Sequence, residues 1–227
     1  MPDAPSPTVP AAVLWDMDGT LVDTEPYWFA AEYDIVERHG GTWNDEHAHA
    51  IVGSDLLAGA AYIQREGGID LEPAAIVEAL LEQVIARARE RTPWQPGAVE
   101  LLTALHEAGI PCALVTMSYA SLAQTVVDQL PAGTFAAVVT GDLVEHGKPH
   151  PEPYLKAAAL LGVDAADCVA IEDSPTGVAS AEAARCHTLA VPHAVSIAPG
   201  PGRTVREEGL LGVDVDWIKA FAGGRAR

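Results

Sequence analysis

Two aspartates, Asp16 and Asp18, stand one residue apart directly after residues 12–15, an apolar run typical of a buried strand. Acidic pairs of this kind occur in calcium loops, which need glycine at the sixth position and glutamate at the twelfth. Counted from Asp16, those positions hold Leu21 and Tyr27, so a calcium loop is excluded. A surface turn would account for Asp18, but not for an aspartate that follows the apolar run without a polar residue between. Because ligands bind at the carboxyl ends of strands in parallel α/β sheets, we expect chemistry here.

Three further polar groups follow predicted strands in the same way. The hydroxyl of Thr116 and the backbone N–H groups around Met117 suit a phosphate oxygen, although a threonine before a helix is often an ordinary cap. Lys148 stands between Gly147 and Pro149, and the proline restricts the backbone there, whereas a lone lysine in a loop is usually solvated. Glu172 and Asp173 follow another apolar run, and Asp173 alone could be a helix cap. Each signal is weak by itself, but together they predict four polar groups at four strand ends.

The acidic composition restricts the partners of the protein. Of its 227 residues 49% are hydrophobic, and 13 basic against 32 acidic residues give a net charge of −19. This charge repels nucleic acid and anionic membrane surfaces, so we expect neither as a partner. An acidic protein that binds an anion needs a local positive field from a metal, a helix N-terminus or a lysine. Lys148 is one of only three lysines in the chain.

Cysteine usage and the N-terminus favour a reducing compartment. Cys112, Cys168 and Cys186 are odd in number and lie in apolar sequence, which predicts packing rather than disulfides or zinc binding. Residues 1–10 are rich in proline and lack the features of a signal peptide, and no apolar run is long enough to span a membrane. We therefore expect a soluble cytoplasmic monomer in which residues 1–10 form a disordered tail.

The second part of the chain alternates regularly between helix and strand patterns with short connections. This alternation predicts an α/β fold in which a Rossmann-like parallel sheet lies between two layers of helices. The predicted helices are residues 98–108, 120–130, 152–161 and 175–185, and the predicted strands after the first are residues 112–117, 135–140, 168–172 and 187–191.

The alternation is interrupted after the first strand by a helical insert. Asp23 or Thr24 can cap a first helix that runs to Arg38, and helical patterns follow at about residues 56–65 and 73–91. A Pro-Trp-Gln-Pro-Gly stretch then reads as a hinge. We expect residues 11–24 and 94–227 to form a catalytic core and residues 25–93 a helical cap domain that acts as a lid.

With these motifs in order, the sequence resembles the haloacid dehalogenase superfamily, specifically its β-phosphoglucomutase-like branch with a helical cap. The likeness covers about residues 12–192. Residues 16–20, DMDGT, match the first motif of the family, Thr116 the second, Lys148 the third and residues 172–173 the fourth. Agreement at all four motifs in the right order is specific.

The resemblance implies phosphoryl transfer through a covalent intermediate. Asp16 would attack phosphorus to give an aspartyl-phosphate, which water then hydrolyses. Asp18 would protonate the leaving oxygen and afterwards deprotonate the water. Lys148 would neutralise the phosphate and orient Asp16, while the Thr116 hydroxyl and the backbone near Met117 would hold the other phosphate oxygens.

The resemblance also implies a Mg²⁺ cofactor, because a carboxylate that attacks a phosphate dianion needs a cation between them. The side chain of Asp16, the backbone carbonyl of Asp18 and the side chain of Asp173 would be its ligands. Glu172 is a further, weaker candidate that would bind the ion through a water molecule.

Departures from individual relatives select the reaction. Dehalogenases lack the second aspartate and the metal, and phosphonoacetaldehyde hydrolases need a cap lysine, whereas residues 25–93 contain none. Sugar-phosphate mutases carry a histidine and an arginine in the cap where this chain has Trp28 and Leu56. We therefore expect a phosphatase acting on a small phosphorylated metabolite, such as a sugar phosphate. A mutase is the first alternative, and a non-catalytic binding protein of the same fold is the second.

Within the insert, Trp28 and Asp55 are candidates for the substrate side, and so is Trp43. Packing inside a small helical bundle is an equally good account of each tryptophan. His47 and His49 form a short HxH motif without acidic partners at a suitable spacing, which predicts surface residues rather than metal ligands.

Overall fold

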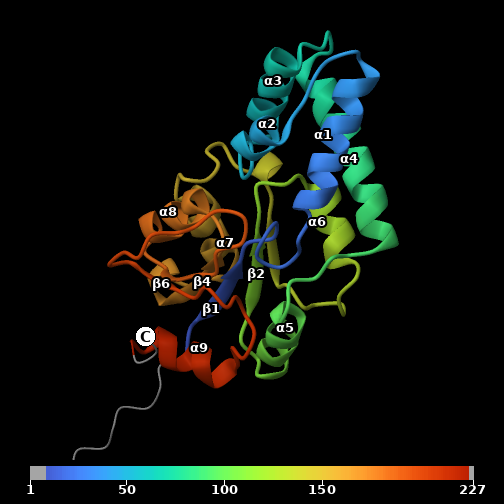
Figure 1. Cartoon of the computed structure of the whole chain (residues 1–227). Coiled ribbons are helices and arrows are strands. Elements are labelled where there is room, and N and C mark those ends of the chain that lie inside the picture. Colours follow the sequence, from blue (N-terminus) through green and yellow to red (C-terminus); the bar gives the residue numbers. More distant parts are fainter. Residues whose placement is uncertain (1–8, 225–227) are drawn as a thin grey trace, which may run out of the picture.

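The computed structural model describes residues 9–224 of the chain (Figure 1). Residues 1–8 of the predicted tail lie outside the described residues. Pro10 is buried, and the Ala11 N–H donates to the Asp167 carbonyl at 2.9 Å, so the chain is fixed to the core before the first strand begins.

In the described part of the chain, six strands form one parallel sheet in the order β3-β2-β1-β4-β5-β6. This confirms the predicted α/β fold with a Rossmann-like sheet. Parallel strands place all their carboxyl ends at one edge, so side chains that follow different strands meet there. The strands are β1 (Ala12–Trp15), β2 (Cys112–Val115), β3 (Ala137–Val139), β4 (Cys168–Glu172), β5 (His187–Ala190) and β6 (Arg203–Val205).

The central strands are buried on both faces, which explains their continuous apolar sequences. Ala12 and Leu14 of β1 pack in one hydrophobic cluster, while Val13 and Trp15 pack in another on the opposite face. The first cluster lies under α7 (Glu152–Leu161) and α8 (Pro175–Ala183). The second lies under α5 (Ala98–Glu107), α6 (Ala120–Val127) and α9 (Val215–Ala222), which completes the three layers (Figure 1).

Between β1 and α5 the chain forms four helices, one more than the sequence predicts. They are α1 (Glu25–Arg38), α2 (Asp45–Ala50), α3 (Leu56–Gly67) and α4 (Pro73–Glu90). The sequence of α2, DEHAHA, has no apolar stripe and therefore gives no helical signal. It begins because the Asn44 side chain accepts a hydrogen bond from the His47 N–H at 3.0 Å.

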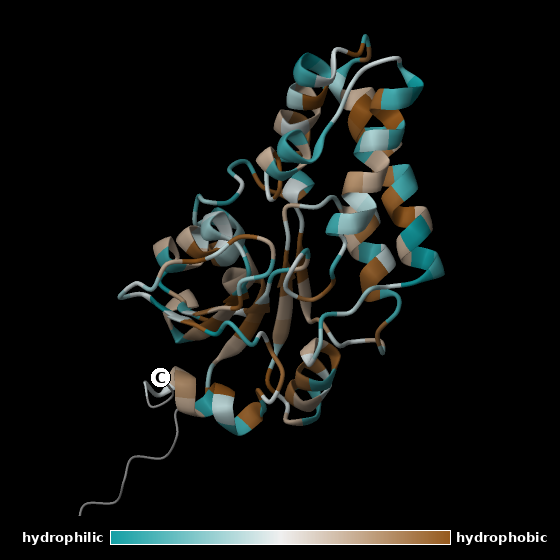
Figure 2. Ribbon diagram, viewed as in Figure 1, coloured by the Kyte–Doolittle hydropathy of each residue, from teal (hydrophilic) through white to brown (hydrophobic). Residues whose placement is uncertain are grey.

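The insert packs on itself and on the core. Helix α4 contacts α1 and α3 within the insert and α6 of the core, and these helices carry alternating apolar and polar bands (Figure 2). One face of α4 is apolar and buried, from Ile76 to Val84. It belongs to the same cluster as Val13 and Trp15 of β1, so the insert and one face of the sheet share a core.

Two segments connect the insert to the core, and they run side by side. The Asp23 N–H donates to the Pro93 carbonyl at 2.7 Å, and the Gln95 N–H donates to the Leu21 carbonyl at 2.9 Å. Gln95 also donates through its side chain to the Gly19 carbonyl at 2.9 Å, next to the aspartate pair. Movement of the insert would therefore act directly on the turn that carries the aspartates.

The remaining expectations about the core hold in part. All three cysteines are buried and free, as predicted. Strand β6 and helix α9 were not predicted, and an expected strand at residues 135–140 is reduced to Ala137–Val139. Within residues 9–224, no helix combines the length and the apolar character that crossing a bilayer requires.

Candidate active site

The first strand delivers Asp16 directly to the carboxyl edge of the sheet. Its N–H donates to the Ile171 carbonyl at 3.1 Å, which extends the pairing of β1 with β4 by one residue. The chain then turns at Gly19, whose φ of +91° favours glycine. A Cβ atom there would lie 2.1 Å from Oδ2 of Asp173. Glycine is therefore needed both for the turn and for the close approach of the second acidic strand end.

Lys148 is buried and holds three strand ends together. Its Nζ donates to Oδ1 of Asp16 at 2.6 Å and to the Val115 carbonyl of β2 at 2.8 Å, and it pairs with Oε1 of Glu172 at 2.7 Å. Its side chain is 5% exposed, so the alternative of a solvated loop lysine is wrong. An ammonium group has three N–H donors, and all three have partners here.

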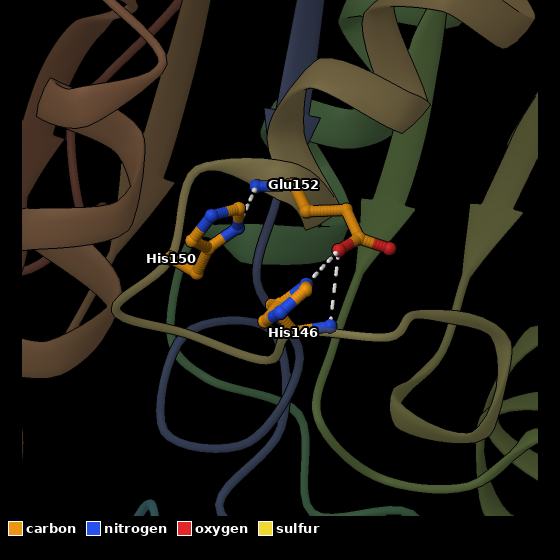
Figure 3. Close-up of side chains that lie close together, drawn as sticks. All are labelled: His146, His150 and Glu152. Atoms are coloured by element: carbon orange, nitrogen blue, oxygen red, sulfur yellow. Dashed lines mark hydrogen bonds and ion pairs between the residues drawn. The ribbon is translucent and has the colours of Figure 1, made fainter.

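The loop that carries Lys148 is fixed from its outer side by Glu152 at the start of α7 (Figure 3). The Glu152 carboxylate accepts from the backbone N–H groups of Glu145 and His146 at 2.8 and 3.0 Å, and it contacts Nδ1 of His146 at 3.1 Å. The Glu152 N–H in turn donates to Nδ1 of His150 at 3.2 Å. Both histidines are exposed, as predicted, and they flank Lys148 without lining the cavity that contains Asp16.

Glu172 is a fully buried partner of Lys148. The hydroxyl of Tyr154 donates to its Oε1 at 2.5 Å. A Cβ atom at Gly177, in the first turn of α8, would lie 2.0 Å from Oε2 of Glu172, so this helix position has no space for a side chain. Ser174 caps α8 by accepting from the Gly177 N–H at 3.1 Å, which leaves Asp173 free of the capping role considered above.

Asp18 is surrounded by hydroxyl groups. Ser118 donates to its Oδ2 at 2.7 Å and Thr116 does so at 3.3 Å, while the hydroxyl of Thr24 donates to Oδ1. The sequence predicted that Asp23 or Thr24 caps α1. The side chain of Thr24 does not do so, because its hydroxyl donates to Asp18 instead. Thr116 is not a helix cap either, since α6 begins at Ala120.

Burial and mutual repulsion shift the ionisation of this cluster. Burial raises the pKa of Asp16 to about 7, although the neighbouring Lys148 opposes the rise. Burial, with repulsion from Asp16 and Glu172, raises the pKa of Asp173 well above its usual value. Burial alone would lower the pKa of Lys148, but the carboxylates of Asp16 and Glu172 raise it instead.

The cluster contains more negative than positive groups. Asp16, Glu172 and Asp173 are buried and offer oxygens within 4.8 Å of one another, against the single ammonium of Lys148. Three carboxylates around one cation favour a further positive charge, and hard oxygen donors suit a hard divalent ion. These three residues could therefore hold a metal ion. Oε1 of Glu172 already contacts both Lys148 and Tyr154, so Glu172 has less capacity to bind a metal ion than Asp16 or Asp173.

A cavity of about 130 Å³ opens from this cluster toward the insert. Asp16, Asp18 and Lys148 line its core side together with Thr116, Met117 and Asp173. Trp28 and Asp55 line it from the insert, so the structure brings every predicted site residue except Glu172 and Trp43 to one cavity. One water molecule needs roughly 10–15 Å³ of such space, so the cavity has the size for a small metabolite.

Several residues of the cavity region were not predicted as site residues. Ser118 and Thr24 hydrogen-bond Asp18, and Glu25 and Glu32 of α1 line the insert side. The spacing of Glu25, Trp28 and Glu32 is helical and places them on one face, which is the signal that could have identified them. Trp43 does not line the cavity but donates its indole N–H to Oε2 of Glu32 at 3.2 Å. His47 is half-buried against Trp43, with 5.1 Å between ring centroids, while His49 is exposed.

Comparison with known proteins identifies the family of the chain. The chain is 36% identical over 187 residues to hexitol phosphatase A of Escherichia coli (strain K12), an alignment that covers 78% of this chain and 81% of the relative. Its fold matches CbbY of Rhodobacter sphaeroides in complex with phosphate with a TM-score of 0.81 and 25% identity, covering 90% and 96% of the two chains.

β-Phosphoglucomutase of Clostridium difficile has the same fold, with a TM-score of 0.79 and 20% identity over 94% of this chain and 97% of the other. Residues 10–185 match the family described as haloacid dehalogenase-like hydrolases. The resemblance stated from the sequence is thus confirmed, and the protein belongs to the haloacid dehalogenase-like hydrolase family.

Proposed function

We propose that the protein is a Mg²⁺-dependent phosphatase that hydrolyses a sugar or polyol monophosphate through an aspartyl-phosphate intermediate. The observation that carries this proposal is the pairing of two carboxylates in one cavity with different surroundings. Asp16 is bound to the ammonium of Lys148, whereas the side chain of Asp18 is bound, among residues 9–224, only by hydroxyl groups. One aspartate is thereby oriented for attack, and the other is placed for proton transfer.

The reaction proceeds in two displacements at phosphorus. In the first, an Oδ atom of Asp16 forms a bond to phosphorus while the ester P–O bond breaks, and Asp18 gives its proton to the leaving oxygen. In the second, Asp18 takes a proton from water, whose oxygen bonds to phosphorus as the Asp16–phosphorus bond breaks. Lys148 holds Asp16 in place throughout, because its ammonium is itself fixed by Glu172 and Val115.

Magnesium fits the donor set of buried carboxylates that Lys148 alone does not neutralise. Asp16 and Asp173 would hold the ion with the carbonyl of Asp18, and Glu172 would bind it through a water molecule. When bound, the ion supplies positive charge that reduces the repulsion between the Asp16 carboxylate and a phosphate dianion.

The charges of the cavity select a substrate with one phosphate. Among the cavity-lining side chains of residues 9–224, Lys148 is the only lysine or arginine, and it lies at the catalytic end. The insert side instead presents Glu25, Glu32 and Asp55. A second phosphate would meet carboxyl groups there, whereas an uncharged hydroxylated chain can hydrogen-bond to them. Hexitol phosphatase A, a relative by sequence, is named for a substrate of this kind.

The same distribution of charge argues against the mutase alternative. A sugar-phosphate mutase must hold a second phosphate far from the nucleophile, and the cap position expected for the arginine that does so holds Leu56. The position expected for a histidine that supports the acid/base residue holds Trp28, and both residues line the cavity. The non-catalytic alternative gives no reason for keeping both aspartates, the buried lysine and Asp173 in one cluster. We infer that the insert, residues 25–93, acts as a cap over a core of residues 11–24 and 94–227, and that the protein works in the cytoplasm as a monomer.

A phosphate-release assay tests this proposal. Purified protein with Mg²⁺ is offered a panel of hexitol, hexose and pentose monophosphates, one sugar bisphosphate and p-nitrophenyl phosphate. We expect release of inorganic phosphate from monophosphates, loss of turnover in EDTA and no turnover by Asp16→Asn. Isomerised sugar phosphate without phosphate release would favour the mutase, and absence of turnover on the whole panel would favour a binding protein.

A further inference from the structure

Glu32 is a carboxyl group in an unusual place, near the middle of α1 and facing the cavity. The residue is only 4% exposed. The insert also lines this cavity with apolar side chains, namely Ala60, Ile63 and Leu80. A buried carboxyl group in apolar surroundings costs free energy unless its oxygens find hydrogen-bond partners.

Only one of the two oxygens of Glu32 has such a partner within residues 9–224. The indole N–H of Trp43 donates to Oε2 at 3.2 Å, and no other side chain or backbone group hydrogen-bonds the carboxyl group. The fully enclosed side-chain atoms without partners in the same residues are Trp15 Nε1 and Asp23 Oδ1. Oε1 of Glu32 is not one of them, so it keeps access to the cavity.

The position of Glu32 along α1 sets the part of the substrate that it can reach. Thr24, the residue directly before this helix, hydrogen-bonds Asp18 at the catalytic end. Glu32 follows eight residues later, roughly 12 Å along the helix axis at ~1.5 Å per residue. It therefore lies where the carbon chain of a bound substrate, rather than its phosphate, would be.

The charge state of Glu32 matches an alcohol better than a second anion. Burial raises its pKa to about 8, with the Trp43 indole opposing the rise. At neutral pH the group is then mostly a carboxylic acid, which can both donate and accept a hydrogen bond. An alcohol hydroxyl also does both.

We propose that Glu32, held by Trp43, hydrogen-bonds a hydroxyl group on the substrate's carbon chain and so selects polyhydroxylated monophosphates over alkyl or aryl phosphates. The inference rests on the proposed phosphatase function and adds to it a residue that determines substrate specificity. When the bound substrate has no hydroxyl group, one oxygen of the buried Glu32 carboxyl group stays without a hydrogen-bond partner. This weakens the binding of such substrates and of their transition states.

The test compares a hexitol 6-phosphate with n-hexyl phosphate, which has the same chain length and no hydroxyl groups. The measured quantity is the ratio of kcat/KM for the hexitol ester to kcat/KM for the hexyl ester. Glu32→Leu should lower this ratio by about 10- to 100-fold, the size expected when a buried polar group is left without its hydrogen-bond partner. Glu32→Gln keeps a donor and an acceptor and should retain most of the selectivity. Glu37→Leu, on the exposed side of the same helix, is the matched control and should leave the ratio unchanged.

Each other outcome counts against a defined part of the account. A ratio in Glu32→Leu within twofold of the wild-type value overturns the assignment. If Glu32→Gln loses as much selectivity as Glu32→Leu, the group binds a cation rather than a hydroxyl, and the assignment is again overturned. A wild-type protein that hydrolyses p-nitrophenyl phosphate but does not prefer the hexitol ester refutes the role of Glu32 and leaves the phosphatase intact. Failure on all three esters refutes the phosphatase itself.

Discussion

Replacing Lys148 by methionine should expose how far the active-site cluster depends on its single cation. The ammonium lies 2.6 Å from Asp16 and 2.7 Å from Glu172 in a site that is almost closed to solvent. Removing one partner of a buried ion pair typically costs about 3–5 kcal/mol, because the remaining charge stays buried. We therefore expect Lys148→Met to lower the free energy of unfolding by about 3–5 kcal/mol at pH 8 in EDTA.

The loss should be smaller at pH 5. Without the ammonium, the pKa of Asp16 rises further above its present value of about 7. A carboxyl group whose pKa is raised by folding does not lower the free energy of unfolding at pH values below its unfolded pKa of about 4. As the pH rises from there through the folded-state pKa, the unfolded state ionises first and the folded state loses stability. The ammonium itself stays protonated over this range, because the pKa of Lys148 is raised. The variant should thus lose stability more steeply than the wild type between pH 5 and pH 8.

Urea unfolding at the two pH values, followed by circular dichroism, measures this difference. Lys219→Met is the matched control, because Lys219 pairs with the exposed Asp216 at 3.4 Å. Such a pair contributes about 0–1 kcal/mol, so its loss should have little effect at either pH. A Lys148→Met variant that loses less than about 1 kcal/mol at pH 8, or loses equal amounts at both pH values, would refute the reasoning.

Three further predictions follow from the same contacts. Gly177→Ala should destabilise the protein by about 1–3 kcal/mol and slow turnover, because its Cβ would lie 2.0 Å from the Glu172 carboxylate. Gly59→Ala in α3 is the control: its Cβ would lie 3.9 Å from the nearest atoms of Ile51, so this variant should be more stable by up to about 1 kcal/mol in urea unfolding. A similar loss of stability in both variants would contradict the packing argument. Mg²⁺ should raise Tm more at pH 8 than at pH 5, since the raised pKa of Asp16 keeps this ligand protonated in acid, and calorimetry showing equal shifts would argue against Asp16 as a ligand. Hydrogen exchange of the Asp23 and Gln95 amides, which join the two connecting segments, should slow when Mg²⁺ and a phosphate mimic bind; unchanged exchange would count against closure of the insert.

The sequence predicted the strand ends well, because a parallel sheet brings them together whatever the loops do. Asp16, Lys148 and Asp173 are far apart in the chain, yet each follows an apolar strand or its connecting loop. Once the strands are parallel, one edge of the sheet collects all of them. The same argument could not decide which hydrogen bonds each group makes, since those depend on side-chain rotamers.

The features that were missed have weak local signals. Tyr154 lies on the buried face of α7 and looks like core, while its hydroxyl serves Glu172. Strand β6 has only three residues at the sheet edge, and α2 has no apolar stripe. Glu32 is polar at a buried helix position, where the pattern alone gives no reason to expect a carboxyl group. Its partner, the Trp43 indole, comes from a neighbouring loop and is defined only by tertiary packing.

The most direct test of the central claim is the search for a phosphoryl group on Asp16. In Asp18→Asn, p-nitrophenyl phosphate still has a good leaving group that needs no proton, while the water in the second step lacks its base. Rapid mixing with Mg²⁺ should therefore release one equivalent of p-nitrophenolate per enzyme, and mass spectrometry should find the phosphoryl group on the peptide that contains Asp16. Absence of both the burst and the modified peptide, or a phosphoryl group on another residue, would contradict the account.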